Sequence, residues 1–210
     1  MAISLRTQDV HNNVSSATTG QTELTGVLAN DLIVSLIRDR DAQTLDNVDD
    51  DVNTAHTPGP STTGDSHALS AYKINSGAGD PDVVVTFLGA CVMSFNTSVW
   101  IPDGTITLED DNASANASGT SHPCGSVTLS GAGLIIAGFL LNVGAAGTLT
   151  PPAGFTALTD DGSGRSKYYY KISSGETVNP TLGTTDPVLS DCVVMAFLDS
   201  PAGGRRFLLH

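Results

Sequence analysis

Two short apolar runs, one in each half of the chain, limit what this sequence can fold into. They span Leu32–Ile37 and Leu134–Leu141. Both are much shorter than the ~20 apolar residues that cross a bilayer as a helix. Their β-branched residues and the turn-forming residues before them favour buried strands. Because consecutive positions are apolar, both faces of each strand must be covered, either by the other half of the chain or by a partner subunit.

The two runs belong to a longer internal repeat. YKINSG at 72–77 matches YKISSG at 170–175, and CVMSF at 91–95 matches VVMAF at 193–197. Together with the apolar runs, these blocks recur in the same order about 100 residues apart. This period indicates the duplication of a domain-sized unit rather than a solenoid of short repeats.

The composition favours strands joined by tight turns. Only 15% of the 210 residues are charged, and Gly, Ser, Thr, Asn and Asp are abundant, which suits turns better than surface helices. The chain is long enough to bury a core without disulfides. Each half carries turn signals at the spacing of β-sandwiches. The sequence therefore predicts an all-β fold, an antiparallel β-sandwich of jelly-roll type built from two related halves.

The expected organisation has four segments. They are an N-terminal arm or edge strand (1–13), a first repeat (14–102), a second repeat (103–200) and a C-terminal tail (201–210). The two repeats form either separate domains or one compact body. Within them, residues 38–66 are expected to form a long polar connection, and residues 103–125 an extended connector with one strand at 105–108.

The charge balance excludes several classes of partner. Nine Lys and Arg oppose 22 Asp and Glu, for a net charge of −13. A nucleic-acid-binding protein needs a basic face, and so does a protein that docks on anionic lipid. Neither nucleic acid nor membrane is therefore an expected partner. The N-terminus shows neither a secretory signal nor a transmembrane run, which places synthesis and assembly in a cytoplasm.

The residues that most often carry chemistry show no reactive pattern. Three cysteines, an odd number without short spacings, indicate neither a disulfide framework nor a zinc site. Cys91 and Cys192 lie in apolar runs and are predicted to be buried, and Cys124 is also assigned a structural role. No histidine pair has H-x-x-x-H spacing, and no G-x-S-x-G elbow is present. The sequence therefore predicts a protein that is not an enzyme and has no cofactor.

An acidic stretch offers the only metal candidates. Asp46, Asp49, Asp50 and Asp51 supply the carboxylate oxygens that calcium prefers. They lack the order of an EF-hand loop, with neither its turn glycine nor its closing glutamate. A solvated acidic loop is the favoured interpretation.

Residues 127–198 resemble a module that is common among tailed-phage proteins. The shared features are an apolar strand (131–136), the corner TPPAGF (150–155), an aromatic strand (168–172) and a closing apolar strand (193–197). Such modules often occur in tandem, and residues 14–98 resemble one more loosely, with the acidic stretch in place of the corner. The resemblance implies a virion structural protein, either a head decoration protein or a tail or fibre component.

Two groups of residues are candidates for binding a partner. Tyr168 and Tyr170 flank Tyr169 in an expected strand; a core Tyr169 with its neighbours at an interface is the favoured arrangement. The alternative is that exposed rings and carboxylates bind a host glycan. Trp100 is expected at the junction between the halves. The tail offers two guanidinium groups and an apolar plug that could dock on a neighbour or on the chain's own surface, or else fray: Arg205, Arg206, Phe207, Leu208 and Leu209.

These expectations combine into one functional prediction. The chain is a non-enzymatic decoration or cement protein on the exterior of a phage capsid. Its partners are the major capsid protein and further copies of itself, in a symmetric oligomer such as a trimer. The alternative is a tail- or fibre-associated module that binds host glycan.

Overall fold

The fold is entirely β. A computed structural model describes residues 3–12, 15–63, 67–142 and 147–201, and every regular element within these ranges is a strand in an antiparallel ladder. The all-β, antiparallel prediction is confirmed. No described segment forms a helix that could cross a membrane. The strands are β1 (Ser4–Asn12), β2 (Ala17–Glu23), β3 (Leu32–Asp39), β4 (Leu45–Asp50), β5 (Thr57–Pro58), β6 (His67–Lys73), β7 (Asp82–Cys91), β8 (Met93–Ile101), β9 (Gly104–Pro123), β10 (Val127–Leu129), β11 (Gly133–Leu141), β12 (Leu149–Thr150), β13 (Thr156–Ala157), β14 (Ser166–Ser173), β15 (Glu176–Val178) and β16 (Thr181–Pro201).

The two apolar runs are the central strands of two large sheets. One sheet has the order β1-β8-β3-β6-β5, and the other has the order β12-β16-β11-β14-β13 with β9 also paired to β16. β3 and β11 are therefore each flanked by two hydrogen-bonded neighbours. Two smaller sheets, β2-β7-β4 and β10-β15, complete the structure.

The strands that carry the repeated blocks are paired in the same order in both halves. β3 lies between β8 and β6, and β11 lies between β16 and β14. The halves differ in the continuity of their strands, since two pairs of strands in the first half correspond to two long single strands in the second. β7 and β8 are separated by Val92 alone, whereas β16 runs unbroken over 21 residues. Likewise, β1 and β2 are separate strands, whereas β9 is one strand of 20 residues.

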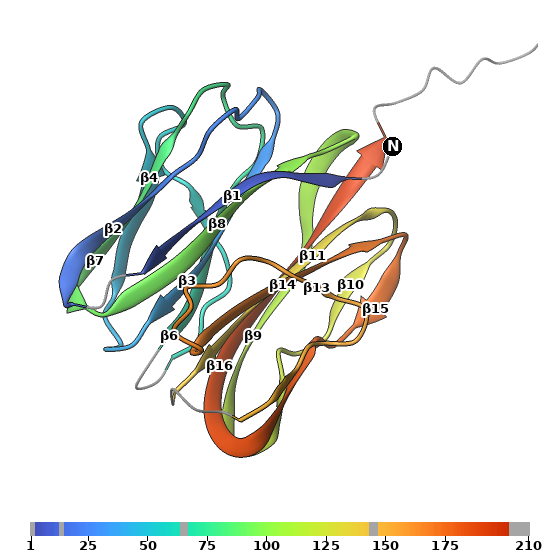
Figure 1. The fold of residues 1–210 in the computed structure, drawn as a ribbon. Helices are drawn as coiled ribbons and strands as arrows, with labels where there is room; N and C mark the ends of the chain where they lie inside the picture. The colour runs from blue at the N-terminus through green and yellow to red at the C-terminus, as the bar shows by residue number, and fades with distance from the viewer. Residues whose placement is uncertain (1–2, 13–14, 64–66, 143–146, 202–210) are drawn as a thin grey trace, which may run out of the picture.

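Three apolar clusters hold the layers together. One lies between the first large sheet and β2-β7-β4, and a second covers the outer face of the second large sheet against the β10-β15 side. The third joins the two large sheets face to face, and we call it the seam (Figure 1). The buried members of the seam are Ile3, Leu32, Val34, Leu36, Ala68, Trp100, Ile106, Leu134, Ile136, Leu140, Leu158, Tyr168, Val193, Met195 and Phe197.

The seam explains why the central strands are apolar on both faces. In β3, Leu32 and Leu36 face the seam, while Ile33 and Ile37 face the cluster on the other side. Every residue of β3 and of β11 is buried. The second face of each strand is therefore covered by the other half of the same chain, and these strands need no partner subunit.

Aromatic rings and one glycine shape the contact across the seam. Trp100 meets Tyr170 edge to face with ring centroids 4.9 Å apart, and Tyr72 meets Phe197 at 5.3 Å. The expected position of Trp100 at the junction is confirmed. At Gly138, an added Cβ would lie 3.3 Å from the Cβ of Leu36, so the two sheets pack closely at a position without a side chain.

Two polar segments have more strand than their composition predicts. The expected connection over 38–66 contains β4 and β5, and the expected connector over 103–125 is almost entirely β9. β4 is held against β7 with Val48 and Asp50 turned inward, and β9 pairs with β16 from end to end. Pairing with an apolar partner strand here overrides the low strand propensity of Asp, Asn, Ser and Ala.

The N-terminal residues also join a sheet. Ser4–Asn12 forms β1, which pairs with β8 at the edge of the first large sheet. The edge-strand alternative therefore describes this segment, with a register shift between Leu5 and Thr7. Asp9 accepts a hydrogen bond from the backbone N–H of Glu23 at 2.9 Å, which ties β1 to the start of the next turn.

Truncation of the seam tryptophan is expected to destabilise the whole chain. Trp100 is fully buried, so Trp100→Ala should lower the free energy of unfolding by about 3–5 kcal/mol. Urea unfolding followed by circular dichroism measures this change. Leu88→Ala, at a side chain that is 69% exposed, is the matched control and should shift stability by less than about 0.5 kcal/mol. Equal effects of the two substitutions would contradict this role for the seam.

Candidate functional site

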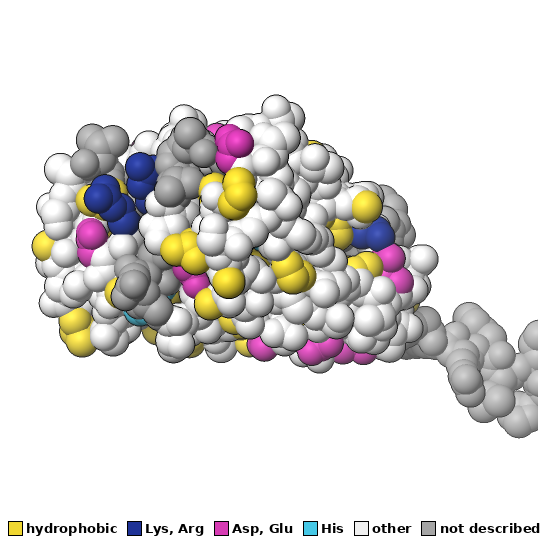
Figure 2. Space-filling model, turned by 90° about the horizontal axis from the view of Figure 1, so that it is seen from below, with side chains coloured by type: hydrophobic (Ala, Val, Ile, Leu, Met, Phe, Trp, Pro, Cys, Tyr) yellow, Lys and Arg dark blue, Asp and Glu magenta, His cyan; other side chains and the backbone are white. Residues whose placement is uncertain are grey.

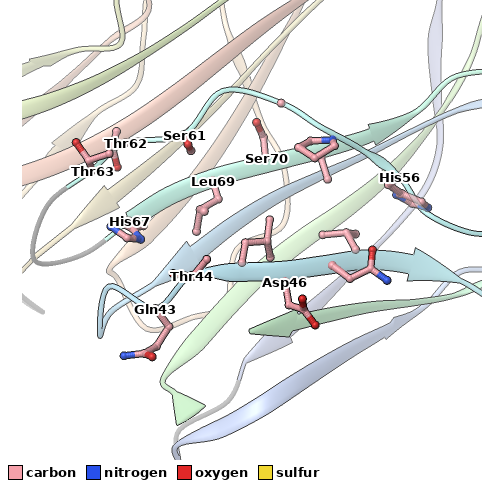
Figure 3. A pocket seen from close by; sticks show the side chains of 16 residues that line it. Gln43, Thr44, Asp46, His56, Ser61, Thr62, Thr63, His67, Leu69 and Ser70 are labelled. Atoms are coloured by element: carbon pink, nitrogen blue, oxygen red, sulfur yellow. The ribbon is translucent and has the colours of Figure 1, made fainter. Parts of the chain in front are cut away.

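A hollow with a largely apolar floor lies in the first half of the chain, beside the edge strand β4. It is a cavity of about 350 Å³ between β4 and the segment that runs beside β6 (Figure 3). Its apolar lining comes from Leu45, Val48, Pro58, Leu69 and Ala71. The polar residues around it are Gln43, Thr44, Asp46, Asn47, His56, Ser61, Thr62, Thr63, His67 and Ser70.

One wall of this cavity is fixed to β6 by backbone pairing. β5 pairs with β6, and Gly59 N–H donates to the carbonyl of Ser70 at 2.9 Å. Thr62 closes this wall, since its N–H donates to the carbonyl of Ala68 and its hydroxyl accepts from the N–H of Ala68, both at 2.9 Å. The wall is thus preorganised by hydrogen bonds.

A buried histidine–aspartate pair anchors the base of the same wall. His56 Nε2 lies 2.7 Å from Asp50 Oδ2, and both side chains are fully shielded from solvent. Burial would raise the pKa of Asp50, but hydrogen bonds from His56 and Asn53 outweigh it and hold that pKa below its ordinary value. Burial lowers the pKa of His56, against the opposing effect of Asp50. His56 Nδ1 has no hydrogen-bond partner.

A second aspartate shapes the other end of the cavity. Asp39, fully buried, accepts a hydrogen bond from the N–H of Asp41 at 2.9 Å and another from the N–H of Gln43. Its Oδ2 also lies 3.9 Å from His67 Nδ1. These contacts hold the loop that leads into β4 and thereby place Gln43 at the cavity.

The arrangement suits binding better than catalysis. An aliphatic floor with hydroxyl, amide and imidazole groups around it is typical of sites for small ligands of mixed polarity. The Nε2 atom of His56 is already paired with Asp50, and the His56 side chain is 0% exposed. His56 is therefore not positioned to accept a proton from a ligand. Among the described residues, no three His, Cys, Asp or Glu side chains lie close enough together to hold a metal ion.

Three of the four acidic candidates lie together and one lies apart: Asp49, Asp50 and Asp51 border a shallow hollow with Asp82, and Asp46 borders the cavity beside β6. Asp46 is exposed and lines the cavity, whereas Asp50 is turned inward as the acceptor for a turn. Asp49 accepts from Asn47 Nδ2 at 2.8 Å, and Asp51 Oδ1 accepts from the N–H of Asp82 at 3.0 Å. The interpretation of this stretch as a solvated loop is corrected, because residues 45–50 are a strand whose alternate side chains point to opposite faces.

The tyrosines do not form an outer binding surface. Tyr168 is 3% exposed and belongs to the seam, and Tyr170 packs against Trp100. Tyr169 is buried on the opposite face against Phe139, as expected for a core residue. Tyr168 therefore faces the seam and not a partner, whereas Tyr170 packs against the seam and stays partly exposed. The five tail candidates, residues 205–209, lie outside the described residues.

All three cysteines are buried and free, as predicted. Burial raises the pKa of Cys91 to about 12 and raises the pKa of Cys124 as well. Cys192 is held between β9 and β16, where its Sγ lies 3.3 Å from the carbonyl oxygen of Pro123. The thiols therefore pack as small apolar side chains.

Comparison with known proteins identifies no relative of this chain. No family model, curated protein or solved structure matches the chain. The cavity could not be predicted from the sequence, because it depends on β4, at the edge of one sheet, lying beside β5 and β6 of another sheet. The only local signal was His56, which follows the acidic stretch by a few residues.

Acidification is expected to destabilise the chain through its buried histidines. Burial lowers the pKa of His56, as well as those of His11 and His122, below the ordinary value of 6.5. The unfolded chain then binds more protons, so the free energy of unfolding should decrease as the pH falls below about 6.5. Urea unfolding at pH 7.5, 6.5 and 5.5 measures this dependence. His56→Gln should make it shallower, and parallel profiles would contradict the assignment.

The burial of the thiols predicts slow chemical labelling. With a pKa raised to about 12, Cys91 holds almost no thiolate at pH 8, and all three thiols are shielded. Ellman's reagent should therefore label none of them in the native protein over minutes and all three in 8 M urea. Rapid native labelling of any thiol would show that its strand opens.

Proposed function

We propose that this chain is a non-enzymatic structural protein of a tailed-phage particle, and within that class a capsid decoration protein. The observation that carries the proposal is the same strand order on both sides of the seam, β8-β3-β6 and β16-β11-β14. We interpret it as two related jelly-roll-type sandwiches fused in tandem. Tandem modules of this kind are what the resemblance to phage structural proteins implies.

The corner that carries the resemblance supports this interpretation. Thr150 ends β12, and the N–H of Phe155 donates to the carbonyl of Pro152 at 3.1 Å. Gly154 adopts φ +77°, a conformation that favours glycine. The corner thus connects β12, which pairs with β16, to β13, which pairs with β14. The motif has a structural role in turning the chain, which fits a module without catalytic residues.

The fused body suits a decoration role. The seam buries the apolar faces of both central strands, so the chain is a self-contained block. Attachment to a capsid then depends on the periphery, which includes exposed apolar side chains such as Leu28, Leu88 and Leu189. The proposed partners are the major capsid protein and further copies of this chain, on the exterior of a capsid assembled in the host cytoplasm.

The alternative of a tail or fibre module that binds host glycan now depends on a different surface. Its original basis, exposed tyrosine rings, is lost because Tyr168 and Tyr169 are buried. The cavity beside Asp46 and Gln43 replaces them as a place for a sugar-sized ligand. Binding of the isolated protein to a glycan array, abolished by Ala71→Trp inside the cavity, would favour this alternative.

Two measurements test the decoration proposal. Quantitative mass spectrometry of purified particles should find hundreds of copies per particle, because decoration sites repeat over the capsid surface. Purified protein should bind capsids that lack it, and deletion of residues 203–210 should weaken that binding at least tenfold if the tail contributes its apolar plug. A handful of copies per particle, or no binding to capsids by the intact chain, would overturn the proposal.

A further inference from the structure

A cluster of guanidinium groups lies at one end of the seam. The chain has six arginines, and four of them fall within the described residues. Three of those four lie close together, since Arg40 and Arg165 both act electrostatically on Arg38. Figure 2 shows Lys and Arg side chains at one end of this face with an acidic group beside them, and another basic group toward the opposite end. In a chain with net charge −13, such a cluster is unexpected.

Arg38 is the central member of this cluster, and it is buried without a partner. It follows Leu36 on the seam-facing side of β3, opposite Ser94 on β8, and is 4% exposed. Its Nε is shielded and unpaired, and within the described residues the guanidinium donates no hydrogen bond. Burial lowers its pKa, and Arg165 and Arg40 add to the effect, whereas Asp161 and Tyr168 oppose it. An unpaired buried charge is strongly unfavourable, which calls for a compensating group.

A neighbouring polar atom is also unsatisfied. Asp161 Oδ2 is buried without a hydrogen-bond partner among the described residues, and Asp161 acts electrostatically on Arg38. Tyr168 also acts on Arg38, and its shielded hydroxyl lies near those of Ser94 and Ser166. Buried polar groups are nearly always satisfied, so an accumulation at one place indicates a missing ligand or water. Ser94 and Ser166, whose hydroxyls lie 2.8 Å apart, complete the polar end of the seam.

The carboxylate of Asp161 acts on Arg38 without forming an ion pair with it. Asp161 Oδ1 accepts hydrogen bonds from Ser163, from its N–H at 2.9 Å and from its hydroxyl at 2.6 Å. No ion pair within 4 Å joins Asp161 to Arg38 or Arg165 among the described residues. Asp39 and Asp41 alternate with Arg38 and Arg40 along the chain, so the case for a ligand rests on the unpaired Nε of Arg38 and not on net charge.

We propose that this end of the seam is a binding site for an oxyanion, a phosphate, sulfate or carboxylate group, with Arg38 and Arg165 as its principal ligands. A guanidinium offers the paired N–H donors that match such groups. The cavity between Arg38 and Tyr168 has a volume of about 10 Å³, room for about one water molecule. The bulk of the ligand therefore lies on the solvent side, where Arg40 is exposed.

The site joins the two halves of the chain. Arg38 and Arg40 come from the first half, and Arg165 and Tyr168 come from the second. A bound oxyanion would therefore link the sheets at the polar end of the seam, where the apolar contacts between the sheets end. This inference does not depend on the proposed virion role, because it concerns only groups within one chain.

Thermal shift and calorimetry with simple anions test the proposal. Phosphate, sulfate and acetate are each compared with chloride at equal ionic strength, using the full-length chain and three variants: Arg38→Met, Arg165→Gln and Lys171→Met. Lys171→Met is the matched control, because it removes one positive charge from a residue that pairs with Glu176 at 2.7 Å near the other end of β14. A free acidic sugar such as N-acetylneuraminic acid, compared with inorganic phosphate, distinguishes a glycan carboxylate from a phosphate source.

The expected result is that at least one oxyanion raises the Tm of the full-length chain and of Lys171→Met, and that Arg38→Met and Arg165→Gln each weaken its binding at least tenfold. The methionine of Arg38→Met fills a volume similar to that of the arginine side chain, so the variant should fold. Asp161→Asn should tighten binding, because it removes the competing carboxylate. Equal responses of all variants, or a response that follows ionic strength alone, would overturn the proposal. So would loss of stability in Asp161→Asn with no anion effect, which would identify Asp161 as the partner of Arg38.

Discussion

The apolar contact between the two large sheets is the constraint on which the rest of the structure depends. β3 and β11 are buried along their whole length, which is possible only because each has a sheet packed on either face. Without the seam, one face of each central strand would expose a row of Leu, Ile and Val side chains, at about 25 cal/mol for each Å² of apolar surface left in water. The two large sheets therefore share one cluster of buried apolar side chains.

This contact also decides where functional groups can be placed. Side chains that point into the seam are unavailable to a partner, which removes Tyr168 from the outer surface, while Tyr170 is only partly buried. Two kinds of place remain: the open edges of the sheets, and the ends of the seam. The cavity beside β4 is a site of the first kind, and the arginine cluster around Arg38 is a site of the second kind. Both are bordered by loops that join strands of different sheets.

Much of the fold was readable from apolar positions, because burial leaves a local signal. The central strands, the burial of the cysteines and the junction role of Trp100 followed from runs and repeats in the sequence. β4 and β9 were missed because their residues are polar, and their strand conformation comes from pairing with β7 and β16. The sequence also did not show what covers the second face of β11. Coverage by the other half of the chain and coverage by another subunit both require the same apolar pattern.

The arginine cluster shows a different limit of sequence-based inference. Arg38 directly follows the apolar run of β3, where a charged residue ordinarily signals the end of burial, yet it is 4% exposed. Its burial follows from Leu140 and Tyr168, more than 100 residues away, which close over it at the end of the seam. A chain under no functional constraint would gain stability from an apolar residue at this position. The proposed oxyanion would compensate for that cost, because it would pair with the shielded Nε of Arg38.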